Sequence, residues 1–154
     1  MSVQKKQKPR YSGKKKRHRI KTQIVTNRKT NEIIAIAQAE GSVHDFRLYK
    51  ESIGSQVADD IKIQGDSGYQ GIDKFHKNSE VPKKKTKNQP LTAAEKAENR
   101  RLARERIAIE NINAKIKVFK IFANKYRNRR KRHGLRMSLI CGVYNYELNC
   151  LEKM

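Results

Sequence analysis

The uneven distribution of charge along the chain is the feature that most restricts how it can fold. Residues 1–30 contain 12 Lys or Arg and no acid, residues 31–80 contain 5 bases against 9 acids, and residues 81–154 contain 20 bases against 6 acids. Only 36% of the 154 residues are hydrophobic, and Trp is absent, which is little apolar material for a globular chain. We therefore expect a single domain with a small core and basic extensions.

The two basic blocks indicate a polyanionic partner. The formal net charge is +22, and clusters of this density are typical of nucleic-acid binding. A solvated basic surface is the alternative, but an acidic segment between basic blocks better suits a protein that holds a polyanion around a cation site. The apolar runs are too short to cross a bilayer, and Cys141 and Cys150 form no disulfide or zinc pattern, so we expect a cytoplasmic, soluble protein.

Alternation of apolar and polar residues predicts a β-hairpin near the N-terminus. The strand begins at Arg19 and ends at Thr26, a polar turn covers Asn27 to Asn31, and the return strand covers Glu32 to Glu40. Helical spacing follows from Val43 to Tyr49, and a second short helix is expected from Gly54 to Asp60.

The middle of the chain contains a carboxylate directly after a short apolar segment. Ile61 and Ile63 predict a short buried strand, and Asp66 follows it. Carboxylates at strand ends are a recurrent way of building active sites in open α/β sheets. A basic loop is expected near residues 82–91.

Two helices are expected in the last third of the chain. Thr92 and Glu95 have the spacing of a capping box, which predicts the start of a long helix. The spacing of the apolar residues Ile109, Ile112, Ile116 and Phe119 predicts its buried face. A basic turn from Lys125 to Arg132 precedes a last helix over residues 135–148.

Three charged residues share one face of the long helix. Arg106, Glu110 and Lys117 fall within roughly 40° of one another around a helix axis, beside the apolar face. An ordinary i,i+4 ion pair on a solvated helix is the structural interpretation, and such pairs contribute little. The functional interpretation depends on the other motifs of the chain.

Four segments, taken in this order, resemble the DDE transposases of bacterial insertion sequences. These are YSGKKKRHRIKTQIV from Tyr11, GSVHDFRLYKES from Gly41, GDSGYQG from Gly65 and YRNRRKRHGLRMSLICGVYN from Tyr126. The pattern R-x3-E-x6-K at Arg106, Glu110 and Lys117 resembles the family's catalytic Glu and its flanking bases. The resemblance covers nearly the whole chain.

The resemblance implies an α/β fold of the ribonuclease-H-like type, followed by C-terminal helices. In that fold three carboxylates converge on two Mg²⁺ or Mn²⁺ ions, and the resemblance assigns Asp66 and Glu110 as catalytic metal ligands. It also implies a partial catalytic domain over residues 19–148, between a basic, partly disordered segment 1–18 and a tail 149–154. Hard cations prefer such carboxylate oxygens.

The resemblance further implies DNA as partner, both at the element's terminal inverted repeats and at the target. The expected phosphate-binding residues are Arg106, Lys117, Lys14, Lys15, Lys16, Arg17, Arg129 and Arg130. Because phosphate neutralisation releases counterions, we expect the affinity for DNA to fall steeply with salt. The family resemblance also allows a homo-oligomer, and it places the protein at the bacterial nucleoid.

The family's first Asp has no counterpart at the start of this chain. Residues 1–10 contain no Asp or Glu, so we expect the first strand and its ligand to be missing and the chain alone to be inactive. Asp45 is the one possible substitute, but it falls in the separate His44-Asp45 pair, and we expect a helix-start role outside the ligand sphere. We expect His44 to be a structural hydrogen-bonding residue.

Two non-catalytic functions compete with a transposase fragment. A basic nucleic-acid-binding protein explains the Lys runs, but not the acidic middle segment or the strand-end carboxylate. A regulatory fragment that inhibits transposition by occupying element ends or partner subunits is the other alternative. A decayed gene, a frameshift partner and internal initiation are three origins compatible with such a chain.

Overall fold

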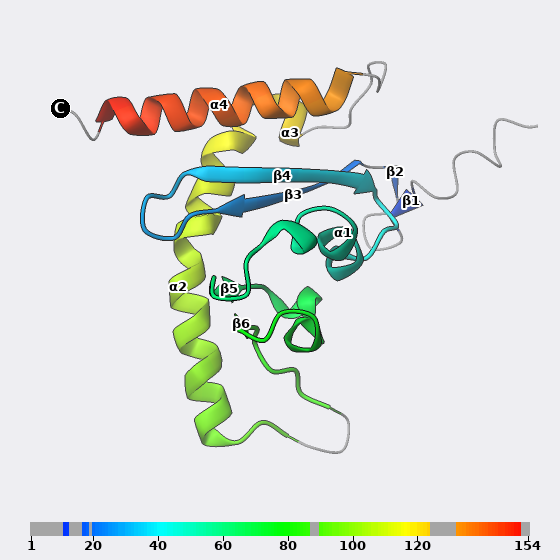
Figure 1. Ribbon diagram of the computed structural model, residues 1–154, viewed down its shortest axis with the longest axis vertical. Coiled ribbons are helices and arrows are strands. Elements are labelled where there is room, and N and C mark those ends of the chain that lie inside the picture. The colour runs from blue at the N-terminus through cyan, green and yellow to red at the C-terminus, as the bar shows by residue number, and fades with distance from the viewer. Residues whose placement is uncertain (1–10, 13–16, 19, 87–89, 124–131, 152–154) are drawn as a thin grey trace, which may run out of the picture. The chain divides into compact units, whose positions relative to one another are not determined.

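The chain forms a mixed α/β structure, seen in a computed structural model that describes residues 11–12, 17–18, 20–86, 90–123 and 132–151 (Figure 1). It divides into two compact units, Met1–Val43 with Ile109–Met154, and His44–Ala108. The longest helix, α2 (Ala93–Lys117), contributes its first part to one unit and its last turns to the other. None of the helices in the described residues is long and apolar enough to span a membrane.

The first unit is built on the expected hairpin. Strand β3 (Ile20–Thr26) pairs antiparallel with β4 (Ile33–Glu40), with Ile24 opposite Ile36. Asn31 adopts a left-handed φ of 59° in the turn, where Asn is one of the few residues that tolerate this conformation. A short antiparallel pair, β1 (Tyr11–Ser12) and β2 (Arg17–His18), precedes the hairpin.

Helix α4 (His133–Leu151) runs along the hairpin in Figure 1 and closes the core of the first unit. The buried cluster consists of Ile33, Ile112, Ile116, Cys141 and Tyr144. The predicted apolar face of α2 is therefore confirmed at Ile112 and Ile116. It is wrong at Phe119, which is 42% exposed because α2 ends at Lys117 and the short helix α3 (Lys120–Ala123) follows.

The second unit consists of short elements packed around aromatic side chains. Its elements before α2 are α1 (Asp45–Glu51), the 3₁₀ turns η2 (Gly54–Gln56), η3 (Ser67–Tyr69) and η4 (Ile72–Lys74), and the strands β5 (Ile63–Gln64) and β6 (Ser79–Glu80). Leu48, Tyr49, Ile72 and Leu102 are its buried hydrophobic residues.

Two expectations for the second unit need correction. The helix expected from Gly54 to Asp60 is only the 3₁₀ turn η2, after which Val57 is extended. The strand expected to be buried is the two-residue β5, which pairs in parallel with β6 alone. With a single neighbouring strand it leaves Ile63 half-buried and Ile61 51% exposed.

The sheets of the described residues are each two-stranded, in the pairs β1–β2, β3–β4 and β5–β6. This confirms the mixed α/β class. The broader sheet of a ribonuclease-H-like fold is not formed among the described residues.

The capping box at the start of α2 is confirmed. The Thr92 N–H donates to Glu95 Oε2 at 2.9 Å, and the Glu95 N–H donates to Thr92 Oγ1 at 3.2 Å. The preceding loop is also attached to this helix, because Asn99 donates to the Lys83 carbonyl and accepts from its N–H, both at 2.9 Å.

The first unit offers a direct test of how α4 is held on the hairpin. Asn145 Oδ1 accepts from the Ile33 N–H and Asn145 Nδ2 donates to the Ile33 carbonyl, both at 2.9 Å. Asn145→Ala leaves both half-buried backbone groups without a partner, so we expect a loss of about 1–3 kcal/mol in the free energy of unfolding.

The matched control is Asn149→Ala, which removes one long, exposed contact to Glu32 at 3.4 Å and should change stability by less than about 0.5 kcal/mol. Both values come from urea denaturation followed by circular dichroism. Equal losses in the two variants would show that Asn145 does not fix α4 to β4.

Candidate functional site

Asp66 is held at the surface by a tight turn that begins directly after β5. It is the N-cap of η3, where its Oδ1 accepts the Gly68 N–H at 2.7 Å and its carbonyl accepts the Tyr69 N–H at 3.1 Å. The residue is exposed, and Oδ2 makes no hydrogen bond within the described residues. One carboxylate oxygen is therefore fixed by a hydrogen bond, and the other has no hydrogen-bond partner among the described residues.

Gly68 lies close to two carboxylates, and its backbone conformation is not of the left-handed kind that favours glycine. A Cβ atom at position 68 would lie 2.9 Å from Asp66 Oδ1 and 3.2 Å from Asp45 Oδ2. Gly71, in contrast, has a φ of 86° and so adopts the left-handed conformation that glycine favours. Any side chain at position 68 has to displace a carboxylate.

Asp45 occupies the first position of α1, which confirms its expected helix-start role. The expected structural role of His44 is also confirmed, because its Nδ1 accepts the Phe46 N–H at 3.3 Å and caps the helix. The Asp45 carboxylate also lies beside Gly68, on the same glycine as Asp66, which was not predicted from the sequence. The separation of 21 positions between the two acids gives no sign of this proximity.

Aromatic packing supports the Asp66 turn from the inside of the second unit. The rings of Tyr49 and Tyr69 meet edge to face with their centroids 6.2 Å apart, and Tyr49 meets Phe75 in the same way at 6.2 Å. Tyr69 also covers Gly65, where an added Cβ would lie 3.1 Å from the Tyr69 side chain. The residues on both sides of Asp66 are thus anchored to α1 and η4.

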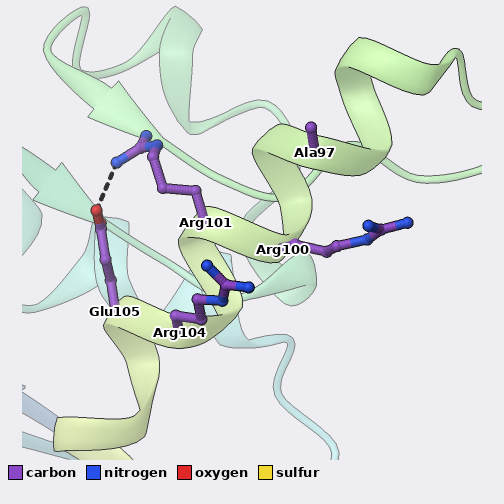
Figure 2. Close-up of a pocket in the computed structure, with 5 residues that line it drawn as sticks. All are labelled: Ala97, Arg100, Arg101, Arg104 and Glu105. Carbon is purple, nitrogen blue, oxygen red and sulfur yellow. Dashed lines mark hydrogen bonds and ion pairs between the residues drawn. The ribbon is translucent and has the colours of Figure 1, made fainter.

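An ion-pair cluster joins both strands of the second unit to α2. Arg101 contacts three carboxylates, at 2.6 Å to Glu98, 2.6 Å to Glu105 (Figure 2) and 3.1 Å to Glu80. Lys62 also pairs with Glu80 at 2.7 Å, and Gln64 of β5 donates to Glu105 at 2.6 Å. The strand that precedes Asp66 is therefore tied to α2 directly by the Gln64–Glu105 hydrogen bond, and its partner β6 is tied to α2 by the Arg101–Glu80 ion pair.

The charged groups of this cluster shift one another's pKa values. Hydrogen bonds to Glu98, Glu80 and Glu105 raise the pKa of Arg101. The pKa of Glu80 is lowered, chiefly by the hydrogen bond from Lys62, although partial burial opposes the shift. The hydrogen bond from Arg101 also lowers the pKa of Glu98. The cluster consequently favours ionised carboxylates.

The three charged residues predicted to act together all lie on α2. Arg106 is half-buried, whereas Glu110 and Lys117 are exposed. Asp66 belongs to the second unit and Glu110 to the first. The convergence of the two carboxylates therefore stays a prediction. Lys14, Lys15, Lys16, Arg129 and Arg130, and the side chain of Arg17, lie outside the described residues.

The donor chemistry of Asp66 and Glu110 fits a hard divalent cation, because both present exposed carboxylate oxygens. Within the described ranges, no group of three or more His, Cys, Asp or Glu side chains is placed to hold a metal ion. Neither unit by itself therefore provides a complete ligand set from its described residues.

The Arg101 cluster makes the stability of the protein dependent on pH in one direction. Because the folded-state pKa values of Glu80 and Glu98 lie below their unfolded values, their contribution is complete above the ordinary Glu pKa, about 4.3, and is lost as the pH falls through the folded values. We expect the midpoint temperature of thermal unfolding to fall as the pH drops below about 4. In Glu80→Gln this midpoint temperature should fall less steeply with pH. An identical acid profile for Glu80→Gln and the unmodified protein, in thermal unfolding from pH 7 to pH 2.5, would contradict this role.

The comparisons with known proteins agree on one family. Residues 1–145 match the family described as DDE superfamily endonuclease. The chain is 49% identical over 144 residues to the probable transposase for insertion sequence element IS702 of Microchaete diplosiphon, a match that covers 94% of this chain and 52% of the relative. The chain thus spans about half the length of that curated relative, and no solved structure matches it. Because the family match covers nearly the whole chain, this protein belongs to the DDE superfamily endonucleases.

Proposed function

We propose that this chain is part of the catalytic domain of a DNA transposase of the DDE type, which cleaves and transfers DNA strands at the ends of an insertion sequence. Asp66 and Glu110 are its second and third catalytic carboxylates, and the complete domain has a ribonuclease-H-like fold. The proposal rests on the family match together with one structural observation. Asp66 is exposed at a turn that fixes one of its oxygens by a hydrogen bond and leaves the other without a hydrogen-bond partner among the described residues.

The cofactor of this family is a divalent cation, and we propose Mg²⁺ or Mn²⁺ in a two-metal site. Asp66 and Glu110 would hold it through carboxylate oxygens. When bound, such ions activate the attacking oxygen and stabilise the leaving oxygen of a phosphoryl transfer. The chain's own contribution is to orient Asp66 through the Gly68 N–H and to keep the position beside it free of a side chain.

The substrate implied by the family is DNA, and we assign Arg106 and Lys117 to phosphates near the scissile bond. Both flank Glu110 on α2, so the same helix would present the carboxylate and the cations that neutralise the DNA beside it. The basic residues Lys14, Lys15, Lys16, Arg17, Arg129 and Arg130 extend the proposed contact with terminal repeats and target DNA. A homo-oligomer at the nucleoid remains compatible with this proposal.

The test is strand cleavage and strand transfer on DNA that carries the element's ends, in Mg²⁺ and in Mn²⁺. It uses this chain and a polypeptide extended upstream through the first Asp of the family pattern. We expect cleavage by the extended polypeptide and a loss of at least about a hundredfold in Asp66→Asn and in Glu110→Gln, because charge stabilisation by the metals amounts to several kcal/mol. The exposed acid Asp59, changed to Asn, is the control and should retain activity.

Two glycine variants test whether the position of the Asp66 carboxylate matters, and not only its presence. Gly68→Ala should reduce cleavage because the new Cβ displaces Asp66 Oδ1, whereas Gly142→Ala, with no atom within 4 Å of the added Cβ, should not. Cleavage that survives Asp66→Asn would refute the proposed site. DNA-end binding without cleavage in the extended polypeptide would favour the non-catalytic, regulatory alternative.

A further inference from the structure

One exposed face of α2 in the second unit carries cations and no acid. Lys96, Arg100 and Arg104 follow one another at intervals of four residues, and all three are exposed. At about 100° per residue they fall within roughly 80° of the helix circumference. We call these three residues the basic stripe.

The acids of this part of α2 all lie elsewhere on the helix. Glu95, Glu98 and Glu105 are each at least about 100° around the axis from every member of the basic stripe. Ordinary solvated helix faces interleave acids with bases, because like charges four residues apart destabilise a helix by about 0.2–0.5 kcal/mol per pair. The stripe therefore has an unfavourable charge arrangement that a polyanion would relieve.

The adjacent residues Arg100 and Arg101 differ in their ion pairing. Arg101 is neutralised by Glu80, Glu98 and Glu105. Figure 2 shows the Arg101 side chain turned toward Glu105, and the Arg100 side chain directed away from it. Among the described residues, the side chains of Arg100 and Arg104 make no ion pair or hydrogen bond, so their donors are available.

The surroundings of the stripe permit close approach of a rod-like polyanion. Three exposed alanines, Ala93, Ala97 and Ala103, lie on or beside this face, the exposed Ile107 follows the stripe on it, and a hollow lined by Ala97, Arg100, Arg101, Arg104 and Glu105 lies alongside (Figure 2). Lys96 and Arg104 are about 12 Å apart along the helix axis, a length over which one DNA strand advances by three to four nucleotides along the duplex axis, at about 3.4 Å each. Arginine binds phosphate through paired donors.

We propose that the basic stripe, Lys96, Arg100 and Arg104, is a binding surface for the phosphate backbone of DNA. This proposal rests on the proposed function, because it adds a contact region to a DNA-processing protein. The contacts are independent of sequence, since an exposed cation that binds phosphate carries no information about the bases.

The experiment measures the affinity of the full chain for a duplex oligonucleotide of arbitrary sequence, by fluorescence anisotropy at several salt concentrations. Arg100→Gln/Arg104→Gln should bind about tenfold more weakly, or worse, at low salt. The plot of its log association constant against log salt concentration should be less steep than that of the unmodified protein. The slope should differ by nearly two, because each lost phosphate contact changes it by about 0.9. Arg100→Lys/Arg104→Lys should keep the slope, because the charges remain.

The matched control is Lys74→Gln/Lys77→Gln, which removes the same charge from exposed positions of the same unit and should leave the slope unchanged. Equal changes of slope in the control and in the arginine variant would show that only the net charge of the protein matters, and this would overturn the proposal. So would an unchanged slope in the arginine variant, once circular dichroism shows that it is folded.

The cleavage assay distinguishes this proposal from the proposed function. A smaller slope in the arginine variant, with no metal-dependent cleavage by the extended polypeptide, would support the stripe and refute the transposase activity. Asp66-dependent cleavage with an identical slope in all variants would support the activity and refute the stripe.

Discussion

An ion-pair network around Arg101 joins the two short strands beside Asp66 to α2. Arg101 binds Glu98 and Glu105 on its own helix and Glu80 on β6, and Gln64 of β5 donates to the same Glu105. β5 and β6 contain two residues each and pair only with one another, so their few backbone hydrogen bonds cannot by themselves hold a strand end in place. The Arg101 ion pairs and the Gln64–Glu105 hydrogen bond add contacts between these strands and α2. The turn with Asp66 as its N-cap follows β5 directly, and Tyr69 packs it onto Tyr49.

Helix α2 carries the Arg101 ion pairs and the exposed cations Arg100 and Arg104 on different faces. Two of its acids, Glu98 and Glu105, pair with Arg101, which also contacts Glu80 on β6. Arg100 and Arg104 remain on the exposed face, where a phosphate backbone can replace the absent carboxylates. Further along, Ile112 and Ile116 enter the core of the first unit, while Glu110 stays exposed. A single helix thus presents structural ion pairs, a cationic face and a carboxylate that fits a metal ligand.

The parts of the fold that local chemistry determines were predictable from the sequence. The hairpin boundaries, the Thr92–Glu95 capping box and the helix-start roles of His44 and Asp45 follow from residues a few positions apart, and they agree with the structure, the strand boundaries to within one residue. The exposure of Ile61 and Phe119 was not predictable from the sequence, because it depends on how many strands pair with β5 and on where α2 ends. The same limit applies to the site. Asp66 was found from its motif, but the approach of Asp45 to Gly68 is a tertiary contact without a local signal.

The central claim is that Asp66 and Glu110, which belong to different compact units, bind the same divalent cations. The most direct measurement is paramagnetic broadening of backbone amide signals by Mn²⁺ in the isotope-labelled full chain. The account predicts that signals around Gly68 and around Asn111 broaden at the same Mn²⁺ concentration, and that either Asp66→Asn or Glu110→Gln abolishes the effect at both places. Broadening confined to one of the two regions, or a response at Gly68 that persists in Glu110→Gln, would show that the two carboxylates do not share a metal site.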